Sequence, residues 1–250
     1  MELVYLCLAA VAAGAVNAIA GGGTLLTFPA LTSVVSAAVA NGTSTVALFP
    51  GSLASVWGYR QQLHACKHWL IWLTPPSILG GALGAWLVEP NSFEKLIPFL
   101  ILLAAVLFLA QPMIARLLKR QVAALQRPSG KLLAGIVVGQ FFIGIYGGYF
   151  GAGIGILMLS SLSFLGLEDI HQTNALKSFL AFCINIVAAA VFIVHDMVDW
   201  RFAAPMAVAA IVGGYLGARL SLLLRPIIVR GIVIVIGFGL AAYYFVKEFG

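Results

Sequence analysis

The chain has 250 residues, of which 62% are hydrophobic and only 9% are charged. An average soluble domain carries about 25% charged residues, and a globule of this length could not hide so much apolar surface from water. The composition therefore excludes an ordinary soluble domain and a disordered chain. It predicts an all-α polytopic membrane protein whose helices lie in a lipid bilayer.

The net charge is +6, and the basic residues lie between apolar runs. This pattern follows from the cytoplasmic bias of Lys and Arg in membrane proteins and does not indicate nucleic acid. Cys7, Cys66 and Cys183 match no disulfide or metal spacing and are interpreted as free thiols. His64 and His68 lie one helical turn apart beside Cys66, but the segment carries no further ligand. We therefore expect neither a metal nor a cofactor.

Hydropathy predicts ten apolar segments in chain order: 3–20, 24–39, 43–60, 70–88, 93–117, 131–150, 153–165, 172–195, 202–222 and 226–247. The first one lacks a basic start and carries Glu2, so we expect a retained helix rather than a signal peptide. A full span needs about 20 residues. The segments 24–39 and 153–165 are shorter, and each follows a glycine cluster. We expect about eight full spans and two short helices that are broken or re-entrant.

The segments form an internal repeat. Three glycines recur 130 positions later, one asparagine recurs 133 positions later, and the eight residues from Gly80 recur from Gly213 with six identities. The matched single residues are Gly14, Gly21, Gly23 and Asn41, with Gly144, Gly151, Gly153 and Asn174. The repeats are expected at about 3–117 and 131–247 within one transporter domain, 1–250. A basic cytoplasmic linker, 118–130, would join them.

The distribution of basic residues predicts the orientation of the repeats. If the segments 131–150 and 153–165 are separate or form a re-entrant hairpin, ten basic residues lie inside and three outside. If they form one continuous helix, nine basic residues lie inside and four outside, which fits the cytoplasmic bias less well. The first arrangement gives five segments per half, and an odd number means that the halves are inverted. Inverted repeats are common in secondary transporters, whose site lies where broken helices meet.

The glycine clusters predict an anion site made of backbone. A helix that begins after a glycine break directs free N–H groups, and about half a positive charge, at whatever lies in the break. The candidate residues at the two breaks are Asn17, Gly21, Gly22, Gly23, Thr24, Tyr146, Tyr149, Gly151 and Gly153. Close helix packing is the alternative role of glycine in membranes. We prefer that role for Gly80, Gly84, Gly213 and Gly217.

Lys177 lies inside an apolar run, where an ammonium is costly unless it faces a polar cavity or a partner. No carboxylate lies within two turns of it, so an anionic substrate is the expected partner. The alternative is that its side chain extends to the membrane interface. Asn41, Thr43, Asn174 and Asn185 are expected to supply neutral hydrogen bonds. For Asn41 and Asn174, ordinary helix N-capping is the alternative.

All eight acidic residues lie in or next to links, so a carboxylate proton relay in the membrane is not expected. His195, Asp196 and Asp199 cluster in one link and would serve an alternative function, an intramembrane enzyme. The chain carries no nucleotide-binding or common hydrolase motif, and we expect no catalytic residue. A channel or an accessory subunit is the other alternative.

The segment from Gly14 to Leu31, GAVNAIAGGGTLLTFPAL, resembles the first-half signature of the TauE/SafE family of sulfite and organosulfur-anion exporters. The segment Gly144–Gly151 is similar to its second-half signature, and 174–177 and 198–200 also fit. The resemblance implies a multi-pass inner-membrane permease for sulfite, a sulfonate such as sulfoacetate, or thiosulfate. Family members often carry Asp where this chain has Asn17 and Gly147. Both departures remove negative charge from the expected site, which suits an anion.

These observations predict a secondary transporter that moves a small anion across the plasma membrane by alternating access. The sequence does not fix the anion, the direction of transport or the coupling ion. It also leaves the oligomeric state open, with a homo-oligomer as one alternative.

Overall fold

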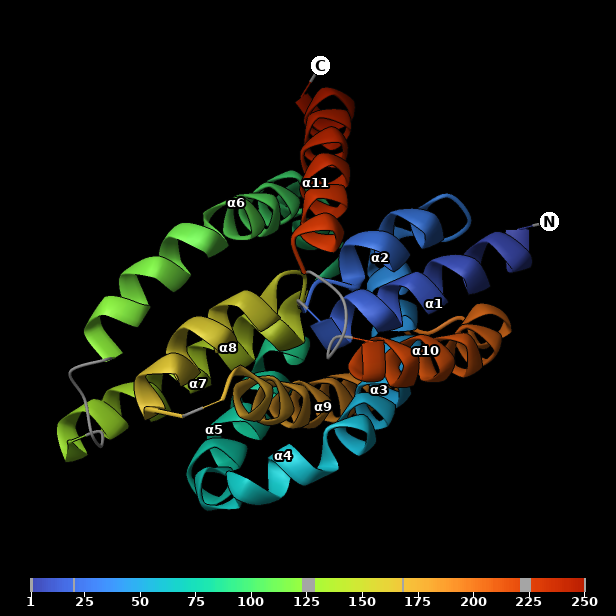
Figure 1. Ribbon diagram of the computed structural model, residues 1–250. Coiled ribbons are helices and arrows are strands. Elements are labelled where there is room, and N and C mark those ends of the chain that lie inside the picture. Colours follow the sequence, from blue (N-terminus) through green and yellow to red (C-terminus); the bar gives the residue numbers. More distant parts are fainter. Residues whose placement is uncertain (1, 20, 123–128, 168, 221–225, 250) are drawn as a thin grey trace.

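Figure 1 shows a computed structural model, which describes residues 2–19, 21–122, 129–167, 169–220 and 226–249. Within these ranges the regular elements are helices, as the composition predicts. They are α1 (Glu2–Ile19), α2 (Thr24–Thr32), α3 (Ala37–Gly58), α4 (Arg60–Ala65), α5 (Lys67–Trp86), α6 (Pro90–Val122), α7 (Gly130–Tyr149), α8 (Ile154–Leu162), the 3-10 turn η1 (Ser163–Leu165), α9 (Ile170–Val194), α10 (Trp200–Leu220) and α11 (Pro226–Phe249). Helices satisfy their own backbone hydrogen bonds, which a bilayer requires.

Four of these helices are long and apolar enough to cross a membrane: Pro90–Met113, Gly130–Tyr149, Ile170–Val194 and Trp200–Arg219. Shorter apolar stretches cover Glu2–Ala18, Ile154–Leu165 and Val233–Lys247. The chain is therefore a multi-pass membrane protein. The expected count of about eight full spans stays a prediction.

Three predicted boundaries differ from those of the structure. The segment expected at 24–39 ends as α2 at Thr32, and α3 begins at Ala37 rather than at 43, because Ser36 adopts an extended conformation between them. Apolar residues lie on both sides of that turn, so hydropathy could not detect it. The linker expected at 118–130 begins as helix, since α6 continues to Val122. Residues 123–128 of that linker lie outside the described residues.

Two helical hairpins meet near the middle of the molecule. The helices α7 and α8 run antiparallel: Gly147 faces Ile154 near the break, and Gly139 faces Ser161 farther along. In the other hairpin, α2 turns back along α1, and Gly23 packs on the Ala13 carbonyl. The segments 131–150 and 153–165 are therefore separate, and the alternative of one continuous helix is wrong.

The hairpins are held by long helices that come from the other end of the chain. The helix α10 packs against α1 and α3, whereas α5 packs against α7 and α9. The glycines of the repeated segment lie in these contacts: Gly80 and Gly84 face the α7 backbone, and Gly213 and Gly217 face the α1 backbone. The preferred interpretation of these four glycines as packing residues is confirmed.

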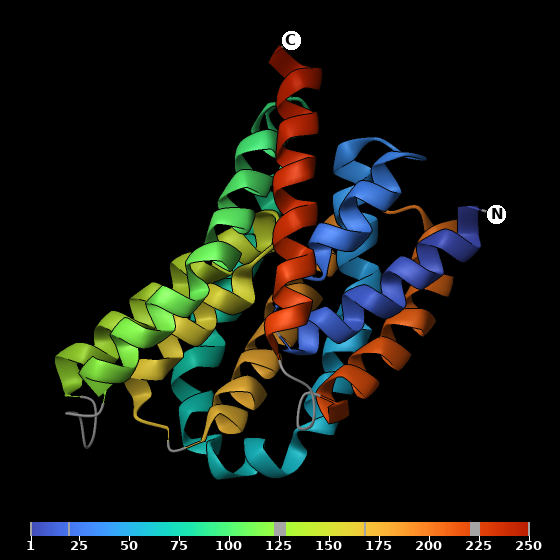
Figure 2. The same cartoon turned by 45° about the horizontal axis from the view of Figure 1, so that its top comes forward.

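Two of the links that carry basic residues lie at the same end of the molecule. In Figure 2, α4 and the start of α7 lie at the lower end, and both chain termini lie towards the upper end. Arg60 and Lys67 belong to the lower group, and so does Lys131. This grouping matches the sidedness that the basic residues predict, and it places the two helical hairpins between the two ends.

Candidate functional site

Both predicted helix breaks are present. The first separates α1 from α2, and the second separates α7 from α8. Gly21, Gly151 and Gly153 have φ angles of +76°, +77° and +76°, a left-handed conformation that side chains other than glycine rarely adopt. The glycine clusters are therefore required by the backbone, because each hairpin must reverse its direction within a few residues.

The two breaks touch each other. The Gly155 amide donates a hydrogen bond to the Gly21 carbonyl oxygen at 3.3 Å. A Cβ atom on Gly21 would lie 2.3 Å from Gly155 Cα, and a Cβ on Gly151 would lie 3.9 Å from the Thr24 hydroxyl. The N-terminal ends of α2 and α8 therefore lie next to each other. The packing leaves no room for an anion between Gly21 and Gly155 in this conformation.

The other glycines at the breaks contact helices nearby. Gly22 lies under the ring of Phe108 in α6, and Gly153 lies beside Ala104 in the same helix. The Gly22 backbone therefore contacts the Phe108 ring directly, and the Gly153 backbone approaches that of Ala104. Packing and backbone geometry both act at these positions, so the two interpretations of the clusters do not exclude each other.

Lys177 is buried, with 1% of its surface exposed. Its ammonium donates hydrogen bonds to the Ala18 carbonyl at 3.0 Å and to the Asn17 carbonyl at 3.5 Å. These carbonyls end α1, where the helix dipole places partial negative charge. The alternative that Lys177 extends to the interface is wrong. The structure supplies a partner that the sequence did not suggest, and a third N–H of the ammonium is left over.

Asn41 makes a contact of the same kind on the other hairpin. Its side-chain amide donates to the carbonyl of Tyr149, the last residue of α7, at 3.0 Å. Asn41 and Asn174 lie inside α3 and α9, whose N-caps are Ser36 and Asp169. The N-capping interpretation of both asparagines is therefore wrong. The Oδ1 atoms of both are buried and have no partner among the described residues.

Tyrosines and polar side chains occupy the surroundings of the breaks. The Tyr146 hydroxyl donates to the Ala152 carbonyl at 2.6 Å, which fixes the second break, and the Tyr149 ring packs on Phe93. The Asn17 amide donates to the Ser52 hydroxyl at 3.4 Å. Asn185 in α9 is half-buried, and the described part of the chain offers it no hydrogen-bond partner.

Thr43 lies away from the breaks. Its hydroxyl accepts a hydrogen bond from the Asp199 amide at 2.9 Å, so it holds the link between α9 and α10. The Asp199 carboxylate pairs with Arg201, and hydrogen bonds from that guanidinium lower the pKa of Asp199. His195 and Asp196 in the same link are exposed. These three residues therefore do not form the enclosed acid–base group that an intramembrane enzyme needs.

Some polar residues near the site were not predicted. The hydroxyls of Thr27 and Ser44 share a hydrogen bond of 2.6 Å, and the buried Ser178 hydroxyl has no partner within the described ranges. The repeat offers a signal for one of them, because Ser44 occupies the position 133 residues before Lys177.

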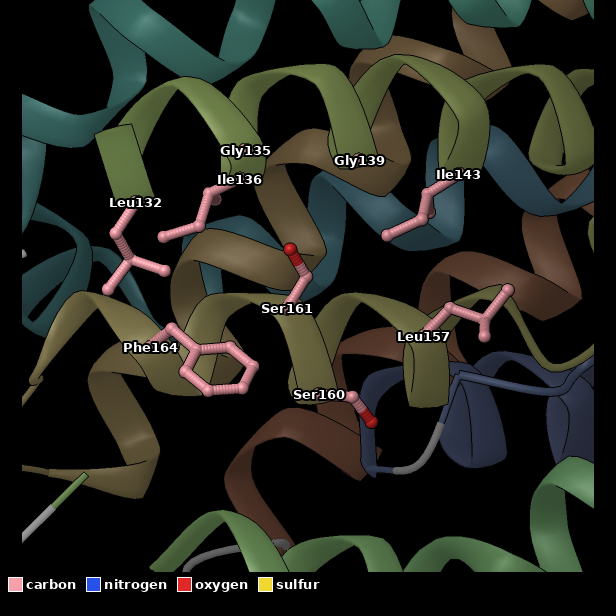
Figure 3. A pocket seen from close by; sticks show the side chains of 9 residues that line it. All are labelled: Leu132, Gly135, Ile136, Gly139, Ile143, Leu157, Ser160, Ser161 and Phe164. Carbon is pink, nitrogen blue, oxygen red and sulfur yellow. The ribbon is translucent and has the colours of Figure 1, made fainter. Parts of the chain in front are cut away.

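A groove of about 410 Å³ lies between α7 and α8 (Figure 3). Leu132, Ile136, Ile143, Leu157 and Phe164 line it with apolar side chains. The only hydroxyls in this lining belong to two serines, and the Ser160 hydroxyl donates to the Ile156 carbonyl. The groove therefore does not suit an anion, and it is distinct from the paired breaks.

Comparisons with known proteins identify the family of the chain. The family model described as "Sulfite exporter TauE/SafE" matches residues 6–244. A "Probable membrane transporter protein" of Haemophilus influenzae is 31% identical over 91% of this chain and 88% of its own length. "Probable membrane transporter protein ORF9" of a Sinorhizobium species is 26% identical over 96% and 90%. "Probable membrane transporter protein YunE" of Bacillus subtilis is 27% identical over 95% and 96%.

No solved structure matches the chain. The family match covers both hairpins and every residue of the two breaks. The chain is a membrane transporter of this type, and it belongs to the TauE/SafE sulfite exporter family.

Proposed function

We propose that this protein is a secondary transporter that moves sulfite or a related small sulfur oxyanion across the bacterial inner membrane by alternating access. One observation carries the proposal: two glycine breaks meet beside the buried ammonium of Lys177. The family description and the relatives' names support transport of this kind. Transport rather than catalysis is the proposed activity of the whole chain, 1–250, as one domain.

The paired breaks offer hydrogen-bond donors to an anion. Several first amides of α2 and α8 donate to break carbonyls in this conformation, such as Leu25 to Gly22 and Ile154 to Gly151. The Gly155 amide donates to Gly21 across the two breaks and becomes free when they separate. The Thr24 hydroxyl has no partner among the described residues, and Lys177 retains one N–H. Sulfite presents oxygen atoms that accept such bonds. Two helix N-termini and one ammonium would hold it, while Asn17, Asn41, Asn174 and Asn185 would add neutral bonds.

Inverted repeats form part of the proposal, and three contacts support them. Phe49 packs on Phe182, Gly21 on Gly155, and Ala105 on Gly237. The first pair matches the repeat offset of 133, the last pair is one position from it, and Gly155 lies four positions after Gly151, the counterpart of Gly21. Residues next to a two-fold axis contact their own counterparts, so these contacts suit two repeats related by such an axis.

The direction of the central helices supports inversion. Gly42 near the start of α3 packs on Phe192 near the end of α9, whereas Tyr59, which follows α3, clusters with Ala175 near the start of α9. The helices α3 and α9 therefore run antiparallel. Because the breaks are in contact, an anion enters the site only when they separate. That requirement fits a carrier that opens to one side at a time.

Flux into proteoliposomes tests the proposal. We expect the wild type to carry radiolabelled sulfite with saturation, and the Lys177→Ala variant to lose about tenfold or more of that flux, because a charge-assisted hydrogen bond is removed. Lys95→Ala is the matched control, since Lys95 is exposed. Unchanged flux in correctly inserted Lys177→Ala would overturn the role of the ammonium. Preference for carboxylates over sulfite, thiosulfate and sulfoacetate would overturn the substrate class.

A further inference from the structure

The helices of this protein assemble into two bundles that do not coincide with its two repeats. The described parts of 2–58 and 200–249 form bundle A, in which α1, α2 and α3 pack with α10, and α11 packs on α2. The described parts of 67–194 form bundle B, in which α7, α8 and α9 pack with α5, and α6 packs on α8. The helices α6 and α11 also pack extensively on each other, so this pair joins the two bundles at their edge. Bundle A therefore contains α10 and α11 from the second repeat, and bundle B contains α5 and α6 from the first repeat.

Contacts within each bundle join backbone to backbone. In bundle A, a Cβ atom on Gly14 or Gly51 would lie 2.5 Å from the Ala210 carbonyl oxygen. In bundle B, a Cβ on Gly84 would lie 2.0 Å from the Ile145 carbonyl oxygen. Helices this close cannot slide past each other without a clash of main chains. Each bundle is therefore suited to act as a rigid body.

Contacts between the bundles are of two kinds: side chains meet at the central crossing, and backbone meets backbone where Gly21 approaches Gly155. The central crossing of α3 and α9 is made by side chains, with the rings of Phe49 and Phe182 6.5 Å apart. Four hydrogen bonds also join the bundles: Gly155 to Gly21, Asn41 to Tyr149, and Lys177 to both Asn17 and Ala18. Each of the four involves a residue in a break or at the helix end before it. The proposed anion site therefore lies at the bundle interface.

The chain crosses between the bundles at two links. Residues 59–66 contain the short helix α4, and residues 195–199 contain Asp196, which has a φ angle of 54°. The first link lies at the lower end in Figure 2, and the second lies towards the end that carries the termini. Thr43 holds the second link through the Asp199 amide. A link at each end lets two bodies tilt against each other, as hinges do.

We propose that bundles A and B, rather than the two sequence repeats, are the bodies that move during transport, and that Lys177 is the positioning residue that latches them at the end of α1. The inference rests on the proposed function in one respect, because it assumes that the protein alternates its access. Lys177 carries the only charge among the four bonds. When Lys177 leaves the α1 carbonyls, bundle B becomes free to move against bundle A. An anion that accepts hydrogen bonds from the ammonium replaces those carbonyls and so releases Lys177.

Distances between spin labels test which bodies move. Leu8 in α1, Leu79 in α5 and Val138 in α7 are exposed sites for single cysteines, introduced into a variant whose three native cysteines are alanine. Leu8 and Leu79 belong to one repeat but to different bundles. Leu79 and Val138 belong to different repeats but to one bundle. The two pairs therefore give opposite answers for bundles and for repeats.

We expect Lys177→Gln, without any substrate, to shift or broaden the Leu8–Leu79 distance distribution and to leave that of Leu79–Val138 unchanged. Sulfite added to the wild type should shift the same pair. A change in Leu79–Val138 with a constant Leu8–Leu79 distance would overturn the bundle assignment. An unchanged Leu8–Leu79 distribution in a Lys177→Gln protein that elutes like the wild type would overturn the latch.

Lys177→Met is the second variant if glutamine is not tolerated in the core. The outcomes also separate this inference from the proposed function. If Lys177→Gln shifts the Leu8–Leu79 distance but sulfite neither binds nor is carried, the bundles and the latch stand and the substrate assignment fails. If sulfite is carried while the Leu8–Leu79 distance stays constant, the function stands and the bundle assignment fails.

Discussion

Replacement of Gly21 by alanine tests the geometry of the paired breaks most directly. Alanine at a φ angle of +76° costs about 1–2 kcal/mol, because its Cβ approaches the following carbonyl oxygen. The new Cβ would also lie 2.3 Å from Gly155 Cα. That contact involves backbone on both sides, so one hairpin must shift, and overpacking of this kind costs about 1–3 kcal/mol. We expect a total loss of about 2–5 kcal/mol.

The assay is thermal unfolding of the purified protein in detergent, with sulfite flux in proteoliposomes as the second measurement. Gly135→Ala is the matched control, since nothing lies within 4 Å of a Cβ there and the residue is inside helix α7. Alanine in an open helical position stabilises by about 0.5–1 kcal/mol relative to glycine. The two variants should therefore move the midpoint in opposite directions. Equal midpoints for Gly21→Ala and Gly135→Ala would refute the argument that the breaks touch.

Three further changes separate binding from stability. Thr24→Val should keep the midpoint, since the hydroxyl has no partner within the described ranges, but should weaken sulfite binding about threefold to tenfold; equal sulfite affinity would remove Thr24 from the site. Tyr146→Phe leaves the Ala152 carbonyl without its donor and should cost about 1–3 kcal/mol, whereas the exposed Tyr243→Phe should cost nothing measurable. The pKa of Asp199 is lowered, owing first to the hydrogen bond from Arg201. The contribution of the Asp199 carboxylate to the stability of the fold is therefore complete above the ordinary Asp pKa, and it is lost as the pH falls through the lowered pKa. Wild type and Asp199→Asn should differ in midpoint near pH 7 and converge in acid, and a constant difference would contradict this assignment.

The sequence was sufficient for the features that depend on composition and on glycine. An apolar chain with few charges must form helices in a bilayer, and the glycine clusters mark the places where two of them reverse. The offset of the repeat also pairs residues that meet in space, such as Phe49 and Phe182. The predictions of helices and of breaks succeed because each follows from a local property of the chain.

The partners of the buried polar groups could not be predicted. Asn41 and Asn174 lie within two residues of the expected segment starts at 43 and 172, too close for hydropathy to distinguish an N-cap from the second turn. Lys177 binds carbonyls about 160 positions earlier in the chain. A backbone carbonyl carries no sequence signal, because every residue has one. Only the placement of α9 against the end of α1 shows which carbonyls are free to accept.

The exchange of helices between repeats could not be predicted either. A sequence repeat shows that two segments fold alike, but it does not show which segments pack together. The glycines at 80–84 and 213–217 indicate close packing without naming the partner helix. Their actual partners, α7 and α1, lie in the other repeat. A boundary drawn at the linker 118–130 separates the two sequence repeats and cuts through bundle B.

Lys177 also makes the two repeats chemically unequal. Its counterpart in the first repeat is Ser44, which bonds to Thr27 within bundle A and carries no charge. In a carrier with two-fold related halves, the open states on the two sides are related by exchange of the repeats. With equal repeats their energies would match. The ammonium is present in the second repeat alone, so the energies of the two open states differ. Opening one side requires Lys177 to leave the α1 carbonyls, and Ser44 in the first repeat has no corresponding bond to break. The substrate-free protein should therefore favour one of its open states, and Lys177→Gln should bring their populations closer together.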